Sequence, residues 1–377
     1  MPIPRKRAIF TQDVTGLTPI QVRKVYNIPE IGGFDGTGAT IGLLEFSSGY
    51  SMTDVAAFAK QFLGLNSVNV HFVSVDGITN DDGESTNDME ATLDVEWALA
   101  MAPKATIYVY SLSAGDGSYS SFHEKLNAAL QYVINLGKNA PSVLSISYGD
   151  SEQNFAIETM YAETEELLTQ LANMGVSVFV SSGDQGVYGE HWLGDDKYRR
   201  VDFPAASPHA IAVGGTSLAV NPYLEKAWTF NGPQNGGATG GGFSYIWSAP
   251  GYQKSAIAKY GQTKRGVPDV AAIADPASGP VVIFEGQRQV VGGTSLACPI
   301  WAAITALIKA HLSLNVAPGD FTEILYQTGG SCCNDITEGN NSYDGVDGYE
   351  AGSGWDPCTG WGSPDAGKLF DLLKGNG

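Results

Sequence analysis

The sequence predicts an α/β fold with a mostly parallel sheet that is covered by helices on both faces. Seven short apolar runs alternate with segments of helical periodicity along the chain, and this order is typical of parallel sheets. Several of the runs are apolar at nearly every position, as expected of strands that are buried on both faces. No Pro- or Ser-rich linker and no break in composition divides the 377 residues, so we assign residues 1–377 to one domain.

The elements follow one another in a regular order, and the pattern of apolar residues distinguishes strands from helices. We expect strands at residues 40–46, 69–75, 106–110, 143–147, 176–181, 209–213 and 280–284, and helices at residues 53–62, 87–102, 120–136, 161–174 and 295–312. Residues 1–16 form an N-terminal extension. Residues 331–362 are rich in Gly, Asn and Asp and indicate a loop region, which we expect to be ordered because Trp355 and Trp361 lie among its glycines.

The balance of charges limits the partners that the protein can have. The chain has 21 basic and 40 acidic residues, which gives a formal net charge of −19. Such a surface repels nucleic acids and anionic membranes, and we expect neither as a partner. An acidic, soluble, secreted protein explains this composition. Adaptation to low pH explains it equally, because protonation of the carboxylates would reduce their mutual repulsion.

The chain shows no sign of a membrane segment or a leader. No run of 18 or more apolar residues is present, so we expect no membrane-spanning segment. The first residues, Met1 to Arg7, are basic but lack the apolar core of a signal peptide. We therefore expect a protein made without a signal peptide, or a trimmed or recombinant form.

Four cysteines are too few for a disulfide framework. Cys298 lies in an apolar helical pattern, where it would act as a small buried hydrophobe. Cys332, Cys333 and Cys358 lie in the Gly-rich loop region, where one disulfide bond to Cys358 is possible. No histidine is close to them in the sequence, which argues against a zinc site.

A repeated hexapeptide contains the candidate nucleophile. Gly-Gly-Thr-Ser-Leu-Ala occurs at residues 214–219 and 292–297, and only the second copy continues into a helical pattern. Pro299 then falls in the first turn, where its missing N–H is tolerated. Ser295 would lie at a helix N-terminus, where the helix dipole and free N–H groups favour developing negative charge. Ser217, in the first copy, has no such setting because Pro222 follows it closely.

Carboxylates are better candidates than histidines for the base that a serine nucleophile needs. The histidines lie outside any Gly-flanked histidine motif, and we interpret each as structural or exposed; they are His71, His123, His191, His209 and His311. Glu90 and Asp94 are one helical turn apart on the same helix face. A solvated acidic face is the common alternative, but Leu93 and Trp97 make this helix apolar enough to bury the pair. Two carboxyl groups this close in a low dielectric do not both ionise readily, so they can hold one proton and pass it on.

A third candidate follows an apolar run that ends in a Gly-rich turn. Asp184 comes three residues after the expected strand at residues 176–181. It would lie at the carboxyl edge of the sheet, where α/β folds collect their active sites. A Ser-Gly-Asp turn alone is an ordinary Asx turn, so its interest depends on the other two elements.

Together these segments resemble the sedolisin family of serine-carboxyl peptidases, in particular its kumamolisin-like branch. The resemblance extends from residues 17–19 to residues 360–364 and includes Phe203 to Pro208 and Gly266 to Ala271. It implies a subtilisin-like fold with a mostly parallel sheet of about seven strands and helices on both faces. The family is commonly made with an N-terminal prosegment, and we expect none in this chain because the catalytic domain begins within its first 20 residues.

The resemblance also implies a role for each candidate residue. Ser295 matches the nucleophile, Glu90 its base, and Asp94 the second acid, which orients Glu90 and shares its proton. Asp184 matches the acidic residue of the oxyanion hole. The implied chemistry is acyl transfer, in which Glu90 takes the proton of Ser295 and a protonated Asp184 binds the oxyanion. Because Asp184 must keep its proton, activity is expected to peak below neutrality.

Two further residues are implied behind this group. Glu45 matches a glutamate that extends the proton network in some members of the family. Tyr148 stands where close relatives often carry tryptophan. A tyrosine can still close the wall of the site and donate a hydrogen bond, so we expect the network behind the pair to differ in detail.

The resemblance further implies one structural Ca²⁺ site in the loop region at residues 331–362. The ligands would be two carboxylates and three backbone oxygens, a set that calcium prefers. They would come from Asp335, Ile336, Gly352, Gly354 and Asp356. An acidic turn without a metal is the alternative.

The expected activity is endopeptidase cleavage of protein and peptide substrates by a secreted monomer. A tripeptidyl exopeptidase of the same family is one alternative, but it would need a group that holds the free amino terminus of its substrate, and we identify none. An inactive calcium-binding scaffold is another. It would predict the loss of at least one of the four catalytic residues, and all four are present.

Overall fold

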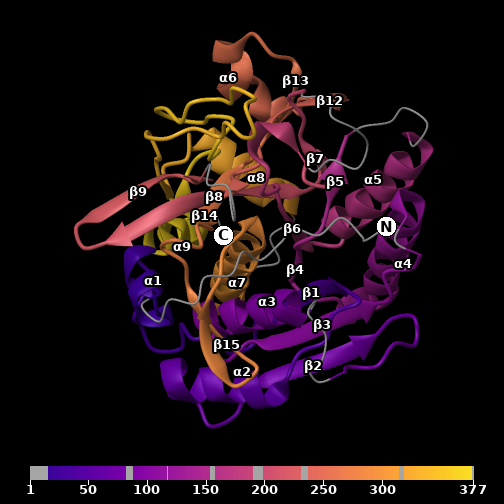
Figure 1. The fold of residues 1–377 in the computed structure, drawn as a ribbon, viewed down its shortest axis with the longest axis vertical. Coiled ribbons are helices and arrows are strands. Elements are labelled where there is room, and N and C mark those ends of the chain that lie inside the picture. The colour runs from indigo at the N-terminus through magenta and orange to yellow at the C-terminus, as the bar shows by residue number, and fades with distance from the viewer. Residues whose placement is uncertain are drawn as a thin grey trace.

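A parallel sheet runs through the centre of the molecule (Figure 1). The computed structural model describes residues 16–81, 88–116, 118–152, 158–189, 198–230, 237–313 and 318–375. Seven strands pair in parallel in the order β14-β8-β6-β4-β1-β3-β2, and β9 adds to β8 in the antiparallel sense. The strands are β1 (Thr40–Phe46), β2 (Asn69–Ser74), β3 (Thr106–Leu112), β4 (Val143–Ile146), β6 (Ser177–Ser181), β8 (Ile211–Val220), β9 (Tyr223–Ala227) and β14 (Val270–Ile273).

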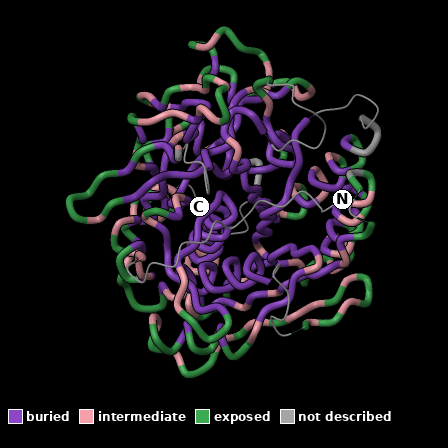
Figure 2. Tube along the Cα trace, viewed as in Figure 1, coloured by how far each residue is buried: buried purple, intermediate pink, exposed green. Residues whose placement is uncertain are grey.

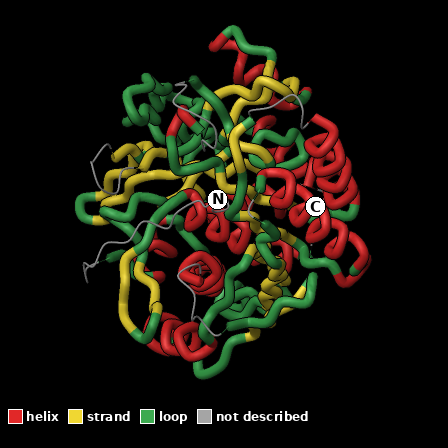
Figure 3. Tube along the Cα trace, turned by 45° about the vertical axis from the view of Figure 1, so that its right-hand side comes forward, coloured by secondary structure: helices red, strands yellow, loops and turns green. Residues whose placement is uncertain are grey.

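Helices cover both faces of this sheet, as predicted (Figure 3). Ile41 and Leu43 of β1 join the cluster of α3 and α7, whereas Leu44 and Phe46 join the cluster of α4 and α5. This alternation follows from the two-residue period of a strand. The helices are α1 (Pro19–Val25), α2 (Met52–Phe58), α3 (Asp88–Met101), α4 (Tyr119–Asn135), α5 (Glu158–Asn173), α6 (Lys254–Ile257), α7 (Thr294–Leu312), α8 (Pro318–Gln327) and α9 (Ala366–Gly375).

Small two-stranded sheets complete the described architecture. They pair β5 (Asp150–Ser151) with β7 (Asp202–Phe203), β10 (Thr229–Phe230) with β11 (Gly237–Ala238), β12 (Gly242–Ser248) with β13 (Lys264–Val267), β15 (Val281–Phe284) with β16 (Gln287–Val290), and β17 (Cys333–Asn334) with β18 (Ser363–Pro364). Short helical turns lie at Ala59–Leu63, Gly137–Asn139, Gly186–Tyr188, Gly251–Gln253 and Ala258–Tyr260. The predicted extension at residues 1–16 lies outside the described residues except for Gly16.

One predicted strand forms, but it lies outside the main sheet. The segment at residues 280–284 forms β15, which pairs with β16 in an antiparallel hairpin and not with the main sheet. The seventh parallel strand is instead β14, which pairs with β8. β14 follows directly on Asp269, and two of its four residues are alanines, so its apolar pattern does not stand out in the sequence.

The helix that carries the candidate nucleophile lies in the core. By length and composition α7 is apolar enough to cross a membrane, but 83% of that stretch is buried inside the protein. Figure 2 shows the same burial along the central helices and strands, with exposed residues mainly on peripheral loops. Since α7 packs against α3 and several strands of the sheet, we interpret it as a core helix.

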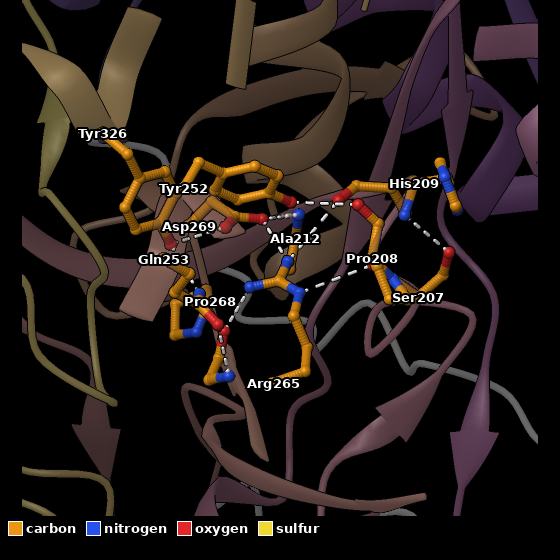
Figure 4. A network of polar contacts seen from close by, with 12 residues as sticks. Ser207, Pro208, His209, Ala212, Tyr252, Gln253, Arg265, Pro268, Asp269 and Tyr326 are labelled. Carbon is orange, nitrogen blue, oxygen red and sulfur yellow. Dashed lines mark hydrogen bonds and ion pairs between the residues drawn. The ribbon is translucent and has the colours of Figure 1, made fainter. Parts of the chain in front are cut away.

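A buried network of polar contacts connects the residues beside the edge strand β14 to the rest of the sheet (Figure 4). Arg265 and Asp269 form a fully buried ion pair with a distance of 2.5 Å between Nη2 and Oδ2. The carboxylate of Asp269 also accepts hydrogen bonds from the backbone N–H of Ala212 at 2.8 Å and from the hydroxyl of Tyr326 at 2.7 Å. Asp269 lies in the Gly266 to Ala271 segment that is part of the family resemblance. These contacts therefore give that segment a structural role.

Candidate active site

Three neighbouring strands deliver side chains to one edge of the sheet. β6, β4 and β1 are adjacent and parallel, so their carboxyl ends lie on the same side. Glu45 is the second-to-last residue of β1, Ser147 and Tyr148 follow β4, and Asp184 follows β6. The sheet therefore brings together residues that are far apart in the sequence.

The helix α3 brings in the predicted carboxylate pair from one side. Every residue of α3 is buried, including Glu90 at 8% exposure and Asp94 at 0%. α3 packs directly against α7, which begins with the candidate nucleophile. The alternative of a solvated acidic helix face is therefore wrong.

Asp94 contacts a second buried carboxyl group, that of Glu45. The two side chains are within hydrogen-bond range of each other. Burial raises the pKa of Asp94 well above its ordinary value, and the charge of Glu45 adds to the effect. Burial likewise raises the pKa of Glu45, with a further contribution from the charge of Glu90. Three carboxyl groups thus influence one another in a region of low dielectric.

Two hydroxyl groups each donate to one oxygen of this carboxyl pair. The hydroxyl of Ser147 donates to Oδ2 of Asp94 at 2.8 Å, and the hydroxyl of Tyr148 donates to Oε2 of Glu45 at 2.9 Å. The predicted hydrogen-bonding capacity of Tyr148 is therefore used, and its partner is Glu45. Ser147 was not among the predicted site residues. Its only sequence signal was its place directly after an apolar strand.

Ser295 is the second residue of α7, in the setting that the sequence predicted. Gly293 precedes the helix with φ of 117°, a conformation that favours glycine. The Ser295 side chain is buried, and its hydroxyl donates to the carbonyl of Ser147 at 3.4 Å. Ser217, the serine of the other hexapeptide, lies within β8 and donates to Asp275 at 2.5 Å.

Asp184 lies beside the first turn of α7. Its Oδ1 accepts from the backbone N–H of Thr294 at 2.7 Å and from the Thr294 hydroxyl at 2.8 Å. Thr294 directly precedes the candidate nucleophile, so its two contacts hold the Asp184 carboxyl group next to Ser295. Sequence reasoning did not identify Thr294, although a threonine stands at the same position in both copies of the repeated hexapeptide, as Thr216 and Thr294.

The described histidines have partners elsewhere in the fold. His209 pairs with Glu165 at 2.6 Å, His71 contacts Asn69 at 2.7 Å, and His311 contacts the carbonyl of Gly33 at 3.3 Å. His123 packs among aromatic rings, namely those of Phe122, Tyr161 and Phe203. His191 lies outside the described residues. These contacts agree with the structural interpretation of the four described histidines.

The loop region at residues 331–362 is ordered and packs behind the Asp184 turn. Trp355 is 1% exposed and its indole donates to the carbonyl of Pro268. The backbone N–H of Val187, three residues after Asp184, donates to the carbonyl of Asn341 at 2.9 Å. The loop region thus supports the chain that follows the oxyanion candidate.

Two of the predicted calcium ligands, the carboxylates of Asp335 and Asp356, contact backbone N–H groups of one turn of this loop region. Asp335 accepts from the N–H of Gly354 at 3.0 Å, and Asp356 accepts from the N–H of Gly352 at 3.0 Å. Burial raises the pKa of Asp356 to about 6. Ile336 directly follows Asp335 and is buried. Within the described residues, no group of three or more His, Cys, Asp or Glu side chains is arranged to hold a metal, so carbonyl oxygens would have to complete any site.

The cysteines do not form the bridge that the sequence left open. All four are buried and none takes part in a disulfide bond; they are Cys298, Cys332, Cys333 and Cys358. The thiol of Cys358 donates to the carbonyl of Tyr349 at 2.7 Å. Cys298 lies in the core of α7, as predicted for a small buried hydrophobe.

Comparison with known proteins agrees with this geometry. Residues 70–362 match the model of the Subtilase family. The chain is 39% identical to kumamolisin from Bacillus sp. (strain MN-32), an alignment that covers 87% of this chain and 58% of that protein. It is 31% identical to tripeptidyl-peptidase 1 of Bos taurus over 86% of this chain and 57% of that protein. The chain therefore spans less than two thirds of the length of these relatives.

A solved structure shows the same fold over almost the whole chain. The complex of Pseudomonas sedolisin, a serine-carboxyl proteinase, with pseudo-iodotyrostatin superposes with a TM-score of 0.82 and 28% sequence identity. The match covers 97% of this chain and 100% of that chain. The predicted subtilisin-like fold is thus confirmed, and the chain belongs to the subtilase family, within its sedolisin group.

Proposed function

We propose that this chain is the catalytic domain of a serine-carboxyl peptidase in which Ser295 attacks a peptide carbonyl. The observation that carries the proposal is the junction at the start of α7. There the Ser295 hydroxyl contacts the Ser147 carbonyl, the Ser147 hydroxyl contacts Asp94, and Thr294 holds Asp184. A serine at a helix N-terminus thus lies among buried carboxyl groups, and this is the machinery of acyl transfer with a carboxylate base. The similarity to kumamolisin and to sedolisin supports the same chemistry.

Glu90 is the proposed base. It lies one helical turn before Asp94 on a helix that packs against α7. During attack, the Ser295 Oγ–carbonyl bond forms while the hydroxyl proton passes to Glu90. The same proton then goes to the leaving amine as the peptide C–N bond breaks, and water hydrolyses the resulting ester by the reverse sequence. The charge of the Glu45–Asp94 pair increases the affinity of Glu90 for this proton.

Asp184 is the proposed acid of the oxyanion hole. Thr294 already occupies Oδ1 with two donors, so the proton that binds an oxyanion would be carried by Oδ2. A carboxyl group donates only while it is protonated, and this restricts the reaction to acid conditions. The N-terminal N–H groups of α7 would bind the same oxyanion.

Cleavage within the substrate chain is the preferred mode, with tripeptide release from a free amino terminus as the alternative. Among the described residues we identify no group assigned to hold a substrate's amino terminus. Peptide libraries with free and with blocked amino termini, incubated between about pH 3 and about pH 7, distinguish the two modes. We expect wild-type protein to cleave both libraries and Ser295→Ala to cleave neither. Release of tripeptides from free termini only would establish the exopeptidase instead, and cleavage by Ser295→Ala would refute the proposal.

We also propose one structural Ca²⁺ site at the turn that Asp335 and Asp356 share. Two carboxylates together with the carbonyls of Ile336, Gly352 and Gly354 form an oxygen-only donor set, which fits calcium. Burial raises the pKa of Asp356 to about 6, and a cation bound beside this carboxylate would lower it. The metal would stabilise the loop region that packs behind Asp184.

The remaining expectations concern the setting of the enzyme. We propose protein and peptide substrates, a secreted location and a monomeric state. The acidic composition supports a protein that works outside the cell at low pH, and it gives no support to nucleic acid or membranes as partners. Light scattering of the purified chain tests the monomer directly.

A further inference from the structure

Each carboxyl group of the Glu45–Asp94 pair has one oxygen with a donor and one without. Oδ2 of Asp94 accepts from Ser147, and Oε2 of Glu45 accepts from Tyr148. The other two oxygens, Oδ1 of Asp94 and Oε1 of Glu45, are buried and receive no hydrogen bond from any donor in the described part of the chain. A buried acceptor without a donor is costly. Because the two groups are within hydrogen-bond range, a single proton shared between these two oxygens would satisfy both.

The two hydroxyls determine which oxygens remain for that proton. The Ser147 hydroxyl has one hydrogen and two acceptors within reach, Oδ2 of Asp94 at 2.8 Å and the carbonyl of Ser295 at 3.3 Å. The shorter contact, to an acidic group, takes the hydrogen. Burial raises the pKa of the Tyr148 phenol well above its ordinary value, so this hydroxyl stays protonated and donates to Glu45. Oδ2 of Asp94 and Oε2 of Glu45 are therefore acceptors, and the proton is left to Oδ1 of Asp94 and Oε1 of Glu45.

Ser147 also touches the nucleophile twice. Its carbonyl accepts from the Ser295 hydroxyl at 3.4 Å, while its own hydroxyl lies 3.3 Å from the Ser295 carbonyl. The residue thus contacts the acid pair with its side chain and the nucleophile with both its side chain and its main chain. Tyr148 has an outer partner as well, since its hydroxyl lies 3.2 Å from that of Ser48.

We propose that Ser147 is a positioning residue of this peptidase. With Tyr148, it confines the single proton of the Glu45–Asp94 pair to Oδ1 of Asp94 and Oε1 of Glu45, and it joins that pair to Ser295. The inference rests on the proposed function, because the pair acts on the reaction through Glu90. With one proton, the pair keeps one negative charge close to Glu90, and that charge makes Glu90 a stronger base. The other acidic group that acts on the pair is Asp88, at the start of α3.

Removal of a donor should make the pair bind a second proton more readily. Ser147→Ala takes a hydrogen bond away from the charged form, so the pair becomes neutral at a higher pH and Glu90 becomes a weaker base. The acidic limb of the kcat/KM profile follows the loss of the pair's negative charge, so we expect this limb to move toward neutrality by about one to two pH units. Tyr148→Phe should move it in the same direction from the Glu45 side. Ser147→Thr keeps a hydroxyl and should restore the limb to its wild-type position.

A matched control and a second readout make the test decisive. Ser217→Ala removes a serine–carboxylate hydrogen bond in β8, outside the proposed site, and should leave the profile unchanged. Infrared difference titration follows the protonated carboxyl groups directly and does not depend on activity, and Asp94→Asn identifies the band of the pair. Should Ser147→Ala fail to fold, Ser147→Thr and Tyr148→Phe still decide the question.

The possible outcomes separate the two proposals. A pair band that titrates at higher pH in Ser147→Ala, together with a shifted acidic limb, supports the positioning role. An active enzyme in which Ser147→Ala and Tyr148→Phe leave both the band and the limb as they are in Ser217→Ala would overturn it. A shifted band in a protein without peptidase activity would support the proton arrangement but refute the proposed function.

Discussion

Replacement of Asp184 separates the two tasks of its carboxyl group. Oδ1 accepts from the Thr294 N–H at 2.7 Å and from the Thr294 hydroxyl at 2.8 Å. The other oxygen is the proposed donor to the oxyanion. Asparagine keeps an acceptor at the first position and places an N–H donor at the second, whereas alanine removes both. Loss of one oxyanion donor lowers kcat by about 10²- to 10³-fold, or about 2.7–4 kcal/mol, and this is the loss expected for Asp184→Ala.

Asp184→Asn should behave differently, because its donor does not depend on protonation. We expect it to retain activity within about tenfold of the wild type at the acid optimum and to lose less activity as the pH rises. The assay is kcat/KM for one peptide across the pH range, with melting curves to confirm folding. Asp275→Asn, which alters a carboxylate bound to Ser217 in β8, is the matched control. Equal losses in Asp184→Asn and Asp184→Ala, with an unchanged pH profile, would refute the reasoning.

Three further predictions concern stability. Burial raises the pKa of Glu152 from 4.5 to about 7. The contribution of this group to the free energy of unfolding is therefore fully present below about pH 4.5 and is lost as the pH rises through about 7. The loss amounts to about 3 kcal/mol. Urea unfolding over this range should show the decline, and Glu152→Gln should reduce it; equal slopes would contradict the assignment. Asp269→Ala leaves the buried Arg265 without its ion-pair partner and should lower the free energy of unfolding by about 3–5 kcal/mol. The double variant Arg265→Met with Asp269→Leu should lose less stability than Asp269→Ala alone. A double variant that melts at a lower temperature than the single one would argue against this. Chelation should lower the melting temperature of the wild type but not of a variant with Asp335→Asn, and identical wild-type curves in excess chelator and excess calcium would exclude the site.

The sequence pattern predicted most of the sheet because its strands are apolar and separated by helical segments. β1 and α7 differ from the predicted ranges by at most one residue. The short strand β14 was missed, and residues 280–284 were placed in the main sheet although they form a hairpin. Periodicity identifies an extended apolar segment, but it does not identify the partner of that segment.

The candidate site was predicted only in part, because local spacing does not identify the contacts between distant elements. Spacing along one helix placed Glu90 and Asp94 on one face, but the partners of Asp94 come from β1 and from the end of β4. Glu45 was reached only through the family resemblance, and Ser147 was not reached at all. A single serine after an apolar strand is common. Its proposed role arises from contacts with two residues far away in the sequence, Asp94 and Ser295, which only the fold reveals.

The pH dependence of kcat/KM for the wild-type chain, measured with an end-blocked peptide from about pH 3 to about pH 9, tests the central claim most directly. A carboxylate base and a protonated Asp184 together predict a maximum clearly below neutrality and a steep loss of activity as Asp184 ionises. Ser295→Ala should be inactive throughout. A maximum near about pH 8, as expected for a histidine base, would contradict the account.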